Sequence, residues 1–218
     1  METSPQLFQD FTKRYYLPAR PYGFALFRLY FRLKVTGVNQ IPPTGGVILV
    51  PNHTSFLDPP LLSSAVPRVI YFLMLHQHYY HPWFHWLFRR LPCIPMKRSA
   101  AGGTAFKHCL QVLEHEQILC MFPEGGISRE HKAQGLRHGA ALLAVHTHAP
   151  IVPVGIYGAS KALALKQWFP RPRAITINFG KPLYAPVSDS HDKALLQYIT
   201  EQTMEQVQAL LSKREKKT

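Results

Sequence analysis

The sequence predicts an α/β fold, in which a mixed, largely parallel sheet is flanked by helices and preceded by an N-terminal amphipathic helical segment. Short runs of apolar residues alternate with helix-like segments over most of the chain. The 218 residues are enough for one domain with a sizeable core, and neither a repeat nor a long linker marks a second one. We therefore expect an N-terminal helical region, residues 1–33, and a main domain, residues 34–218.

The elements follow from this pattern in chain order. Residues 1–33 look helical, with helix breaks expected near Pro18 and Pro21, since proline removes a backbone donor. Apolar runs bounded by Gly, Pro or polar residues then predict seven strands, at Lys34–Val38, Val47–Pro51, Val69–Leu73, Cys93–Met96, Ile118–Phe122, Ile151–Ile156 and Ala174–Phe179. Helical periodicity predicts helices at Pro60–Ala65, His81–Arg90, Ala101–His115, Leu136–Thr147 and Asp189–Lys213.

The chain is strongly basic, with 25 Lys and Arg against 12 Asp and Glu. Such a charge favours a polyanionic partner, either nucleic acid or an anionic membrane surface. Near the N-terminus, Phe24, Phe27 and Tyr30 interleave with Arg28 and Arg32, which is typical of a basic amphipathic helix. This pattern favours a membrane over nucleic acid, so no nucleic-acid partner is expected. A helix docked on the sheet is the alternative interpretation.

No apolar run approaches the roughly 20 residues that span a bilayer. The first residues also lack the apolar stretch of a signal peptide. We therefore expect a peripheral or monotopic protein on the cytoplasmic face of a membrane, the face that attracts basic residues. The aromatic stretch from Tyr79 to Trp86 fits a membrane interface, an acyl-chain groove or the core.

Cysteine and histidine usage indicates neither disulfides nor a metal centre. Cys93, Cys109 and Cys120 lie in apolar surroundings without a close Cys pair, so we expect buried thiols in a reducing compartment. The histidines between His76 and His85 lack the spacing of a helical metal motif, and no carboxylate lies among them to orient ligands. No metal site is therefore predicted.

A histidine and a carboxylate follow the apolar strand Val47–Pro51, in the run Asn52-His53-Thr54-Ser55-Phe56-Leu57-Asp58. A loop that leaves a buried strand is a common place for chemistry, because the strand end holds it rigidly. An imidazole can take up a proton near neutral pH, and a neighbouring carboxylate can fix its tautomer and stabilise the imidazolium. His53 and Asp58 are therefore candidates for a general base and the residue that orients it.

Asp58 also stands out by its charge. It is the only acidic residue between Asp10 and Glu114, a stretch that holds twelve Lys and Arg residues. A helix-capping role is the alternative, because an aspartate followed by Pro59 is a common start of a helix.

Three further segments end predicted strands with polar or small residues. Phe122-Pro123-Glu124-Gly125-Gly126 combines a carboxylate with two glycines, which let the backbone approach a ligand closely. Met96-Lys97-Arg98 ends in two cations that can hold an anion such as phosphate. Val152-Pro153-Val154-Gly155-Ile156 is a strand that enters a glycine.

Taken in this order, Asn52–Asp58, Arg98, Phe122–Gly125 and Val152–Val154 resemble the motifs of the glycerolipid acyltransferase family, best known for the lysophosphatidic acid acyltransferases. The resemblance covers about residues 34–183. It implies transfer of a fatty acyl group from acyl-CoA or acyl carrier protein to the hydroxyl of a lysophospholipid, most simply 1-acylglycerol 3-phosphate, in phospholipid biosynthesis. It implies no tightly bound cofactor, because the thioester carries the activation.

The resemblance also assigns roles. His53 would take the proton from the acceptor hydroxyl and Asp58 would orient it, so the hydroxyl attacks the thioester without an acyl-enzyme. Arg98 would hold the acceptor phosphate and Glu124 the acceptor backbone. The full set of expected substrate-binding residues is Asn52, Ser55, Lys97, Arg98, Glu124 and Gly125. Backbone amides near Val154 and Gly155 would stabilise the oxyanion.

The third motif departs from the family pattern. Family members usually read Glu-Gly-Thr-Arg-Ser, whereas this chain has Gly126 and Ile127 in place of the Thr and Arg. Another lysolipid, an aminolipid or glycerol 3-phosphate therefore remains an alternative acceptor. A non-catalytic basic protein that binds membranes by charge is a second alternative, although it leaves the ordered motifs unexplained.

Overall fold

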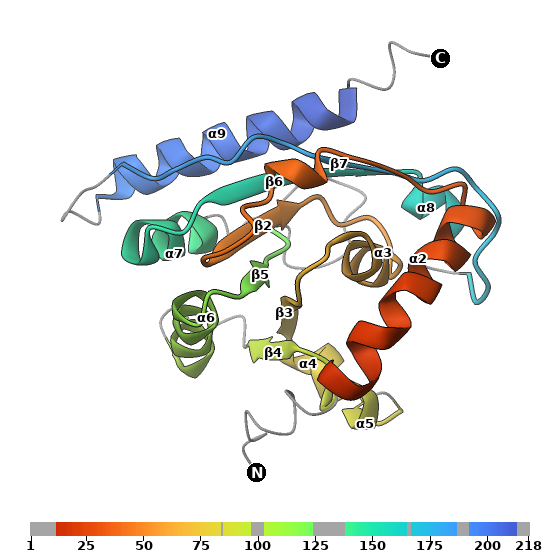
Figure 1. Cartoon of the computed structure of the whole chain (residues 1–218). Helices are drawn as coiled ribbons and strands as arrows, with labels where there is room; N and C mark the ends of the chain where they lie inside the picture. The colour runs from red at the N-terminus through yellow and green to blue at the C-terminus, as the bar shows by residue number, and fades with distance from the viewer. Residues whose placement is uncertain are drawn as a thin grey trace.

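The structure, a computed structural model, describes residues 12–83, 85–96, 103–123, 138–164, 167–186 and 192–212. In this part of the chain seven strands form one sheet, in the order β1-β7-β6-β2-β5-β3-β4 (Figure 1). The strands are β1 Lys34–Thr36, β2 Val47–Pro51, β3 Ile70–Leu75, β4 Cys93–Met96, β5 Ile118–Cys120, β6 Ile151–Tyr157 and β7 Thr176–Phe179. Each corresponds to a predicted strand: β2 and β4 have the predicted bounds, and the others differ only at their ends.

The sheet is mixed and largely parallel, as predicted. Strands β6, β2, β5, β3 and β4 run in one direction, whereas β7 is antiparallel to β6 and carries β1 parallel to itself. The central strand β2 is buried throughout, with Val47 and Leu49 in one core cluster and Ile48 and Val50 in the other. A continuous apolar run is what a strand needs when helices cover both faces of a sheet.

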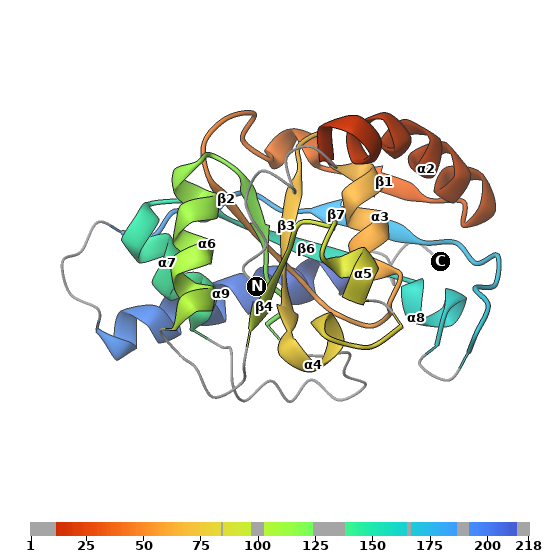
Figure 2. The same cartoon turned by 90° about the horizontal axis from the view of Figure 1, so that it is seen from below.

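Helices form the two outer layers (Figure 1). Helices α6 (Thr104–Glu114), α7 (Gly139–Thr147) and α9 (Lys193–Ser212) cover one face, and α3 (Asp58–Ala65) and α2 (Leu17–Tyr30) cover the other. Figure 2 shows α2 lying along the outer side of α3. The shorter helical segments are η1 (Thr12–Tyr16), η2 (Val38–Gln40), α4 (His76–Tyr79), α5 (His85–Phe88) and α8 (Ala159–Ala162).

Two helix predictions were wrong in detail. The expected break at Pro21 is absent, since α2 runs through it from Leu17 to Tyr30. Pro21 lies close to the start of the helix. It lacks the N–H that would bond to a carbonyl of the first turn, so only one hydrogen bond near the helix start is lost. The expected helix over His81–Arg90 is reduced to α5, which begins after Pro82. The predicted helix ends at Ala101, Leu136, Asp189 and Lys213 lie outside the described residues.

Helix α2 has two apolar faces. Phe24 and Phe27 pack against the core, as expected for a helix docked on the domain. On the other face Tyr22, Leu26 and Leu29 are 78%, 60% and 83% exposed. Within the described ranges, no helix has both the length and the apolar character needed to cross a bilayer.

Gly155 explains how α9 can lie directly against β6. A Cβ atom at this position would come within 2.9 Å of the Leu210 Cβ and 3.3 Å of the Leu210 carbonyl carbon. Such distances are too short for an ordinary contact, so only glycine permits this approach of helix and strand. The glycine that marks this strand in the sequence therefore has a packing role.

Candidate active site

The loop that carries His53 leaves the carboxyl end of β2, which lies between β6 and β5 in the sheet. Residues 52–57 form this loop, and α3 begins directly after it at Asp58. In α/β proteins ligands bind beyond the carboxyl ends of parallel strands, where loops from neighbouring strands meet. The predicted catalytic pair therefore stands where the fold favours a site.

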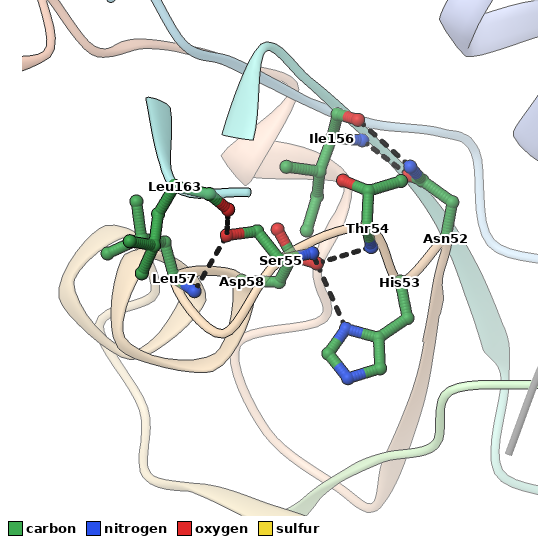
Figure 3. Close-up of polar contacts among 8 residues, drawn as sticks. All are labelled: Asn52, His53, Thr54, Ser55, Leu57, Asp58, Ile156 and Leu163. Carbon is green, nitrogen blue, oxygen red and sulfur yellow. Dashed lines mark hydrogen bonds and ion pairs between the residues drawn. The ribbon is translucent and has the colours of Figure 1, made fainter. Parts of the chain in front are cut away.

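One carboxylate oxygen of Asp58 contacts three polar groups of the loop (Figure 3). Asp58 Oδ2 lies 2.9 Å from His53 Nδ1 and accepts hydrogen bonds from the backbone N–H groups of Thr54, at 2.7 Å, and Ser55, at 2.9 Å. The side chain of Asp58 is fully buried, whereas that of His53 is 13% exposed. The carboxylate therefore sits beneath the loop, and the imidazole lies nearer to solvent.

This arrangement fixes the tautomer of the imidazole. A carboxylate can only accept, so His53 Nδ1 carries the hydrogen and Nε2 keeps the lone pair of the neutral ring. The helix-capping interpretation does not describe this aspartate. Its oxygen binds amides of the preceding loop, and Leu57, the residue at the cap of α3, makes no side-chain capping bond.

The third motif begins beside His53. The rings of His53 and Phe122 stack with their centroids 4.0 Å apart and an interplanar angle of 26°. Phe122 lies two residues after the end of β5, the neighbour of β2, so the first and third motifs meet at one edge of the sheet. Glu124 and Gly125, together with Lys97 and Arg98 after β4, lie outside the described residues.

Asn52 and Ser55 hold the loop in place. Asn52 Nδ2 donates to the Ile156 carbonyl at 2.9 Å, and the Ile156 N–H donates to Asn52 Oδ1 at 2.7 Å. Ser55 Oγ donates to the Leu163 carbonyl at 2.8 Å and accepts from the Leu57 N–H at 3.2 Å. Asn52 is 3% exposed and Ser55 is 1% exposed, so both side chains are placed to fix the loop to β6 and to the end of α8.

The comparison with known proteins adds the family. The sequence model of the family described as "Acyltransferase" matches residues 32–157, which span β1 to β6 and include the whole His53 loop. The chain belongs to the acyltransferase family.

Relatives and solved structures agree with this assignment. A 1-acyl-sn-glycerol-3-phosphate acyltransferase of Bacillus subtilis is 24% identical over 183 residues, which cover 83% of this chain and 89% of that protein. A chloroplast protein of the same description from Arabidopsis thaliana is 24% identical over 62% of this chain, but this match spans only 38% of the plant protein. The fold matches the crystal structure of the lysophosphatidic acid acyltransferase PlsC from Thermotoga maritima, with a TM-score of 0.65 and 24% identity over 94% of this chain and 86% of that one.

Val154 and Gly155, whose backbone amides the sequence led us to expect near the oxyanion, are part of the central sheet. Both residues lie inside β6, where Val154 pairs with Pro51 of β2 and with Phe179 of β7, and Gly155 pairs with Asn178. The amides of a strand that is paired on both sides usually bind the neighbouring strands, which counts against these two amides as oxyanion donors. Gly155 packs against Leu210, and the oxyanion role of these amides stays a prediction.

The three cysteines of this acyltransferase are free and buried, as predicted. Burial raises the pKa of the Cys93 and Cys109 thiols to about 12. Burial, together with the nearby Asp58 carboxylate, also raises the pKa of Cys120 well above its ordinary value. The nucleophilic form of cysteine is the thiolate, so these protonated thiols are poor candidates for an acyl carrier.

The aromatic stretch after β3 is divided between core and surface. Tyr79 is 2% exposed, whereas Tyr80, Trp83 and Trp86 are exposed. The rings of His76 and His85 pack against Tyr80, with centroid distances of 4.3 and 4.9 Å. These histidines thus take part in aromatic packing, and in the described ranges no three His, Cys, Asp or Glu side chains converge on a common point.

Proposed function

We propose that this acyltransferase moves a fatty acyl group from a thioester to the hydroxyl of a lysophospholipid, with 1-acyl-sn-glycerol 3-phosphate as the favoured acceptor. The observation that carries the proposal is the bond between His53 Nδ1 and Asp58 Oδ2 at the carboxyl end of β2. The activity for which these relatives are named supports this acceptor. Acyl-CoA or acyl carrier protein is the donor.

In the proposed reaction His53 Nε2 takes the proton from the acceptor hydroxyl as its oxygen attacks the thioester carbonyl carbon. Asp58 holds the ring and stabilises the imidazolium that forms, because its oxygen lies 2.9 Å from Nδ1. The carbon–sulfur bond then breaks, and the leaving thiolate takes the proton back from His53. The acyl group passes directly to the acceptor, in keeping with the buried and protonated cysteines.

The remaining residues take roles from the motif match. Lys97 and Arg98 bind the acceptor phosphate, and Glu124 and Gly125 bind the acceptor backbone. Asn52 and Ser55 position the loop, since their polar atoms bind Ile156 and Leu163. Residues 1–33 attach the domain of residues 34–218 to the cytoplasmic face of a membrane, and the apolar exposed face of α2 supports this role.

A panel of acceptors tests the proposal. Purified full-length protein is given palmitoyl-CoA with lysophosphatidic acid, lysophosphatidylcholine, an amine-bearing lysolipid or glycerol 3-phosphate, and thiol release is followed. We expect kcat/KM to be highest with lysophosphatidic acid, because the phosphate next to the glycerol matches two cations after β4. A preference for another acceptor would refute this choice and point to Gly126 and Ile127 as the cause. The experiment is repeated with palmitoyl-acyl carrier protein as the donor. Absence of thiol release with every acceptor and with both donors would refute acyl transfer to lysolipids.

A further inference from the structure

A second apolar surface, far from the N-terminus in sequence, is held out from the protein by the turn Gln167–Arg173. Trp168 is the most exposed large apolar side chain of the described residues, at 94%, and its neighbour Phe169 is 83% exposed. Full burial of an aromatic side chain contributes about 1.5–3 kcal/mol. Two adjacent rings that gain none of this in the folded protein indicate a surface that is covered in use.

Two hydrogen bonds attach the turn to the rest of the protein. The Arg171 N–H donates to the Ala162 carbonyl at 2.7 Å, and the Tyr30 hydroxyl donates to the Pro170 carbonyl at 2.8 Å. Pro170 and Pro172 restrict the backbone at and just after these anchors. The two rings are therefore held outward at low entropic cost.

The bond from Tyr30 places the turn at the C-terminal end of α2. Tyr30 is the last residue of α2, and Figure 1 shows the segment after α8 passing the C-terminal end of this helix. Leu26 and Leu29 are exposed on the last turns of the same helix. Apolar side chains from two distant parts of the chain thus lie on neighbouring elements.

The positive charge around the turn favours an anionic partner. Arg171 and Arg173 are exposed within it, and the sequence has no acidic residue between Glu130 and Asp189. Aromatic rings flanked by guanidinium groups suit the headgroup region of an anionic bilayer, where rings enter the interface and the cations meet phosphates. A second copy of this basic chain would bring cations against cations, which disfavours self-association through the turn.

We propose that the turn Gln167–Arg173 inserts Trp168 and Phe169 into an anionic phospholipid surface, as a membrane contact in addition to the N-terminal region. The turn also reaches the catalytic loop. Leu163, at the end of α8, accepts the hydrogen bond from Ser55 Oγ, and Ala162 accepts the bond from Arg171. The contact therefore orients the His53 loop relative to the lipid surface, a role that rests on the proposed function, whereas the insertion itself does not.

The test measures binding of the full-length protein to vesicles, without donor or acceptor. Vesicles of phosphatidylglycerol and phosphatidylcholine are compared with vesicles of phosphatidylcholine alone, by co-sedimentation. We expect the double variant W168S/F169S to bind the anionic vesicles at least about tenfold more weakly, since partial burial of two rings is lost. The variant R171Q/R173Q should weaken binding to the anionic vesicles only, by about fivefold for each cation removed, because only an anionic surface attracts the guanidinium groups.

The matched control is Tyr198→Ser. Tyr198 is 60% exposed on α9, which covers the other face of the sheet, so its loss should leave vesicle binding unchanged. Unchanged binding of W168S/F169S, with thermal unfolding as in the parent, would overturn the proposal. Unchanged vesicle binding with an altered sedimentation coefficient would overturn it too and identify the turn as a protein contact. Because vesicle binding is measured without donor or acceptor, the result can be interpreted even if the protein shows no acyl transfer activity.

Discussion

Replacing His53 by alanine is expected to lower the rate of acyl transfer by about 10²–10⁴-fold, the usual contribution of a general base. The acceptor hydroxyl would then have to lose its proton to water while it attacks the thioester. The measurement is the initial rate of thiol release from palmitoyl-CoA in the presence of the best acceptor.

The control for this variant is His115→Ala. His115 is an exposed histidine at the end of α6, whose Nδ1 contacts the Gln111 carbonyl and which lies outside the proposed machinery. We expect its loss to leave the rate unchanged. Activity in His53→Ala within twofold of the parent would exclude His53 as the base.

Replacing Asp58 by asparagine is expected to have the second-largest effect, a loss in kcat that approaches that of His53→Ala. The variant keeps an oxygen for the N–H groups of Thr54 and Ser55 but loses the negative charge that stabilises the imidazolium. The residues proposed to bind the acceptor lie elsewhere in the chain, so the KM for the acceptor should change little. Steady-state kinetics over a range of acceptor concentrations separate the two effects.

Asp58→Asn should also unfold more easily than the parent. Asp58 Oδ1 is buried, and among the described atoms it has no hydrogen-bond partner. An amide NH₂ at that position would be a buried donor without an acceptor, which costs about 1–3 kcal/mol. Asp192→Asn, at an exposed position before α9, serves as the control for both readouts. A raised KM with an unchanged kcat would place Asp58 in acceptor binding and contradict its orienting role.

Much of the fold was predictable because its signals are local. β2 was predicted with its observed bounds, since its apolar run is preceded by Gly45 and Gly46 and meets the Asn52 loop after Pro51. The order of the strands has no such signal, because it depends on which crossover each helix makes. The helices α4 and α8, of four residues each, are too short for periodicity to indicate.

The candidate site was likewise predictable from the sequence only where its contacts are local. His53 and Asp58 are five residues apart, so their pairing could be expected from the sequence. The tethers of the loop could not, because Asn52 and Ile156 are separated by 104 residues and Ser55 and Leu163 by 108. The motif at Val154 and Gly155 gives a related example. A sequence does not reveal whether a strand's amides are already used by a neighbouring strand.

Rapid-mixing measurement of thiol release from palmitoyl-CoA, with and without lysophosphatidic acid, tests direct acyl transfer most sharply. The cysteines are buried and protonated, so the chain's own thiols should not disturb the assay. Direct transfer predicts no release without acceptor, one thiol per ester formed with it, and an unchanged protein mass throughout. A burst of thiol equal to the enzyme concentration without acceptor, with a palmitoyl group on the protein, would contradict the general-base mechanism.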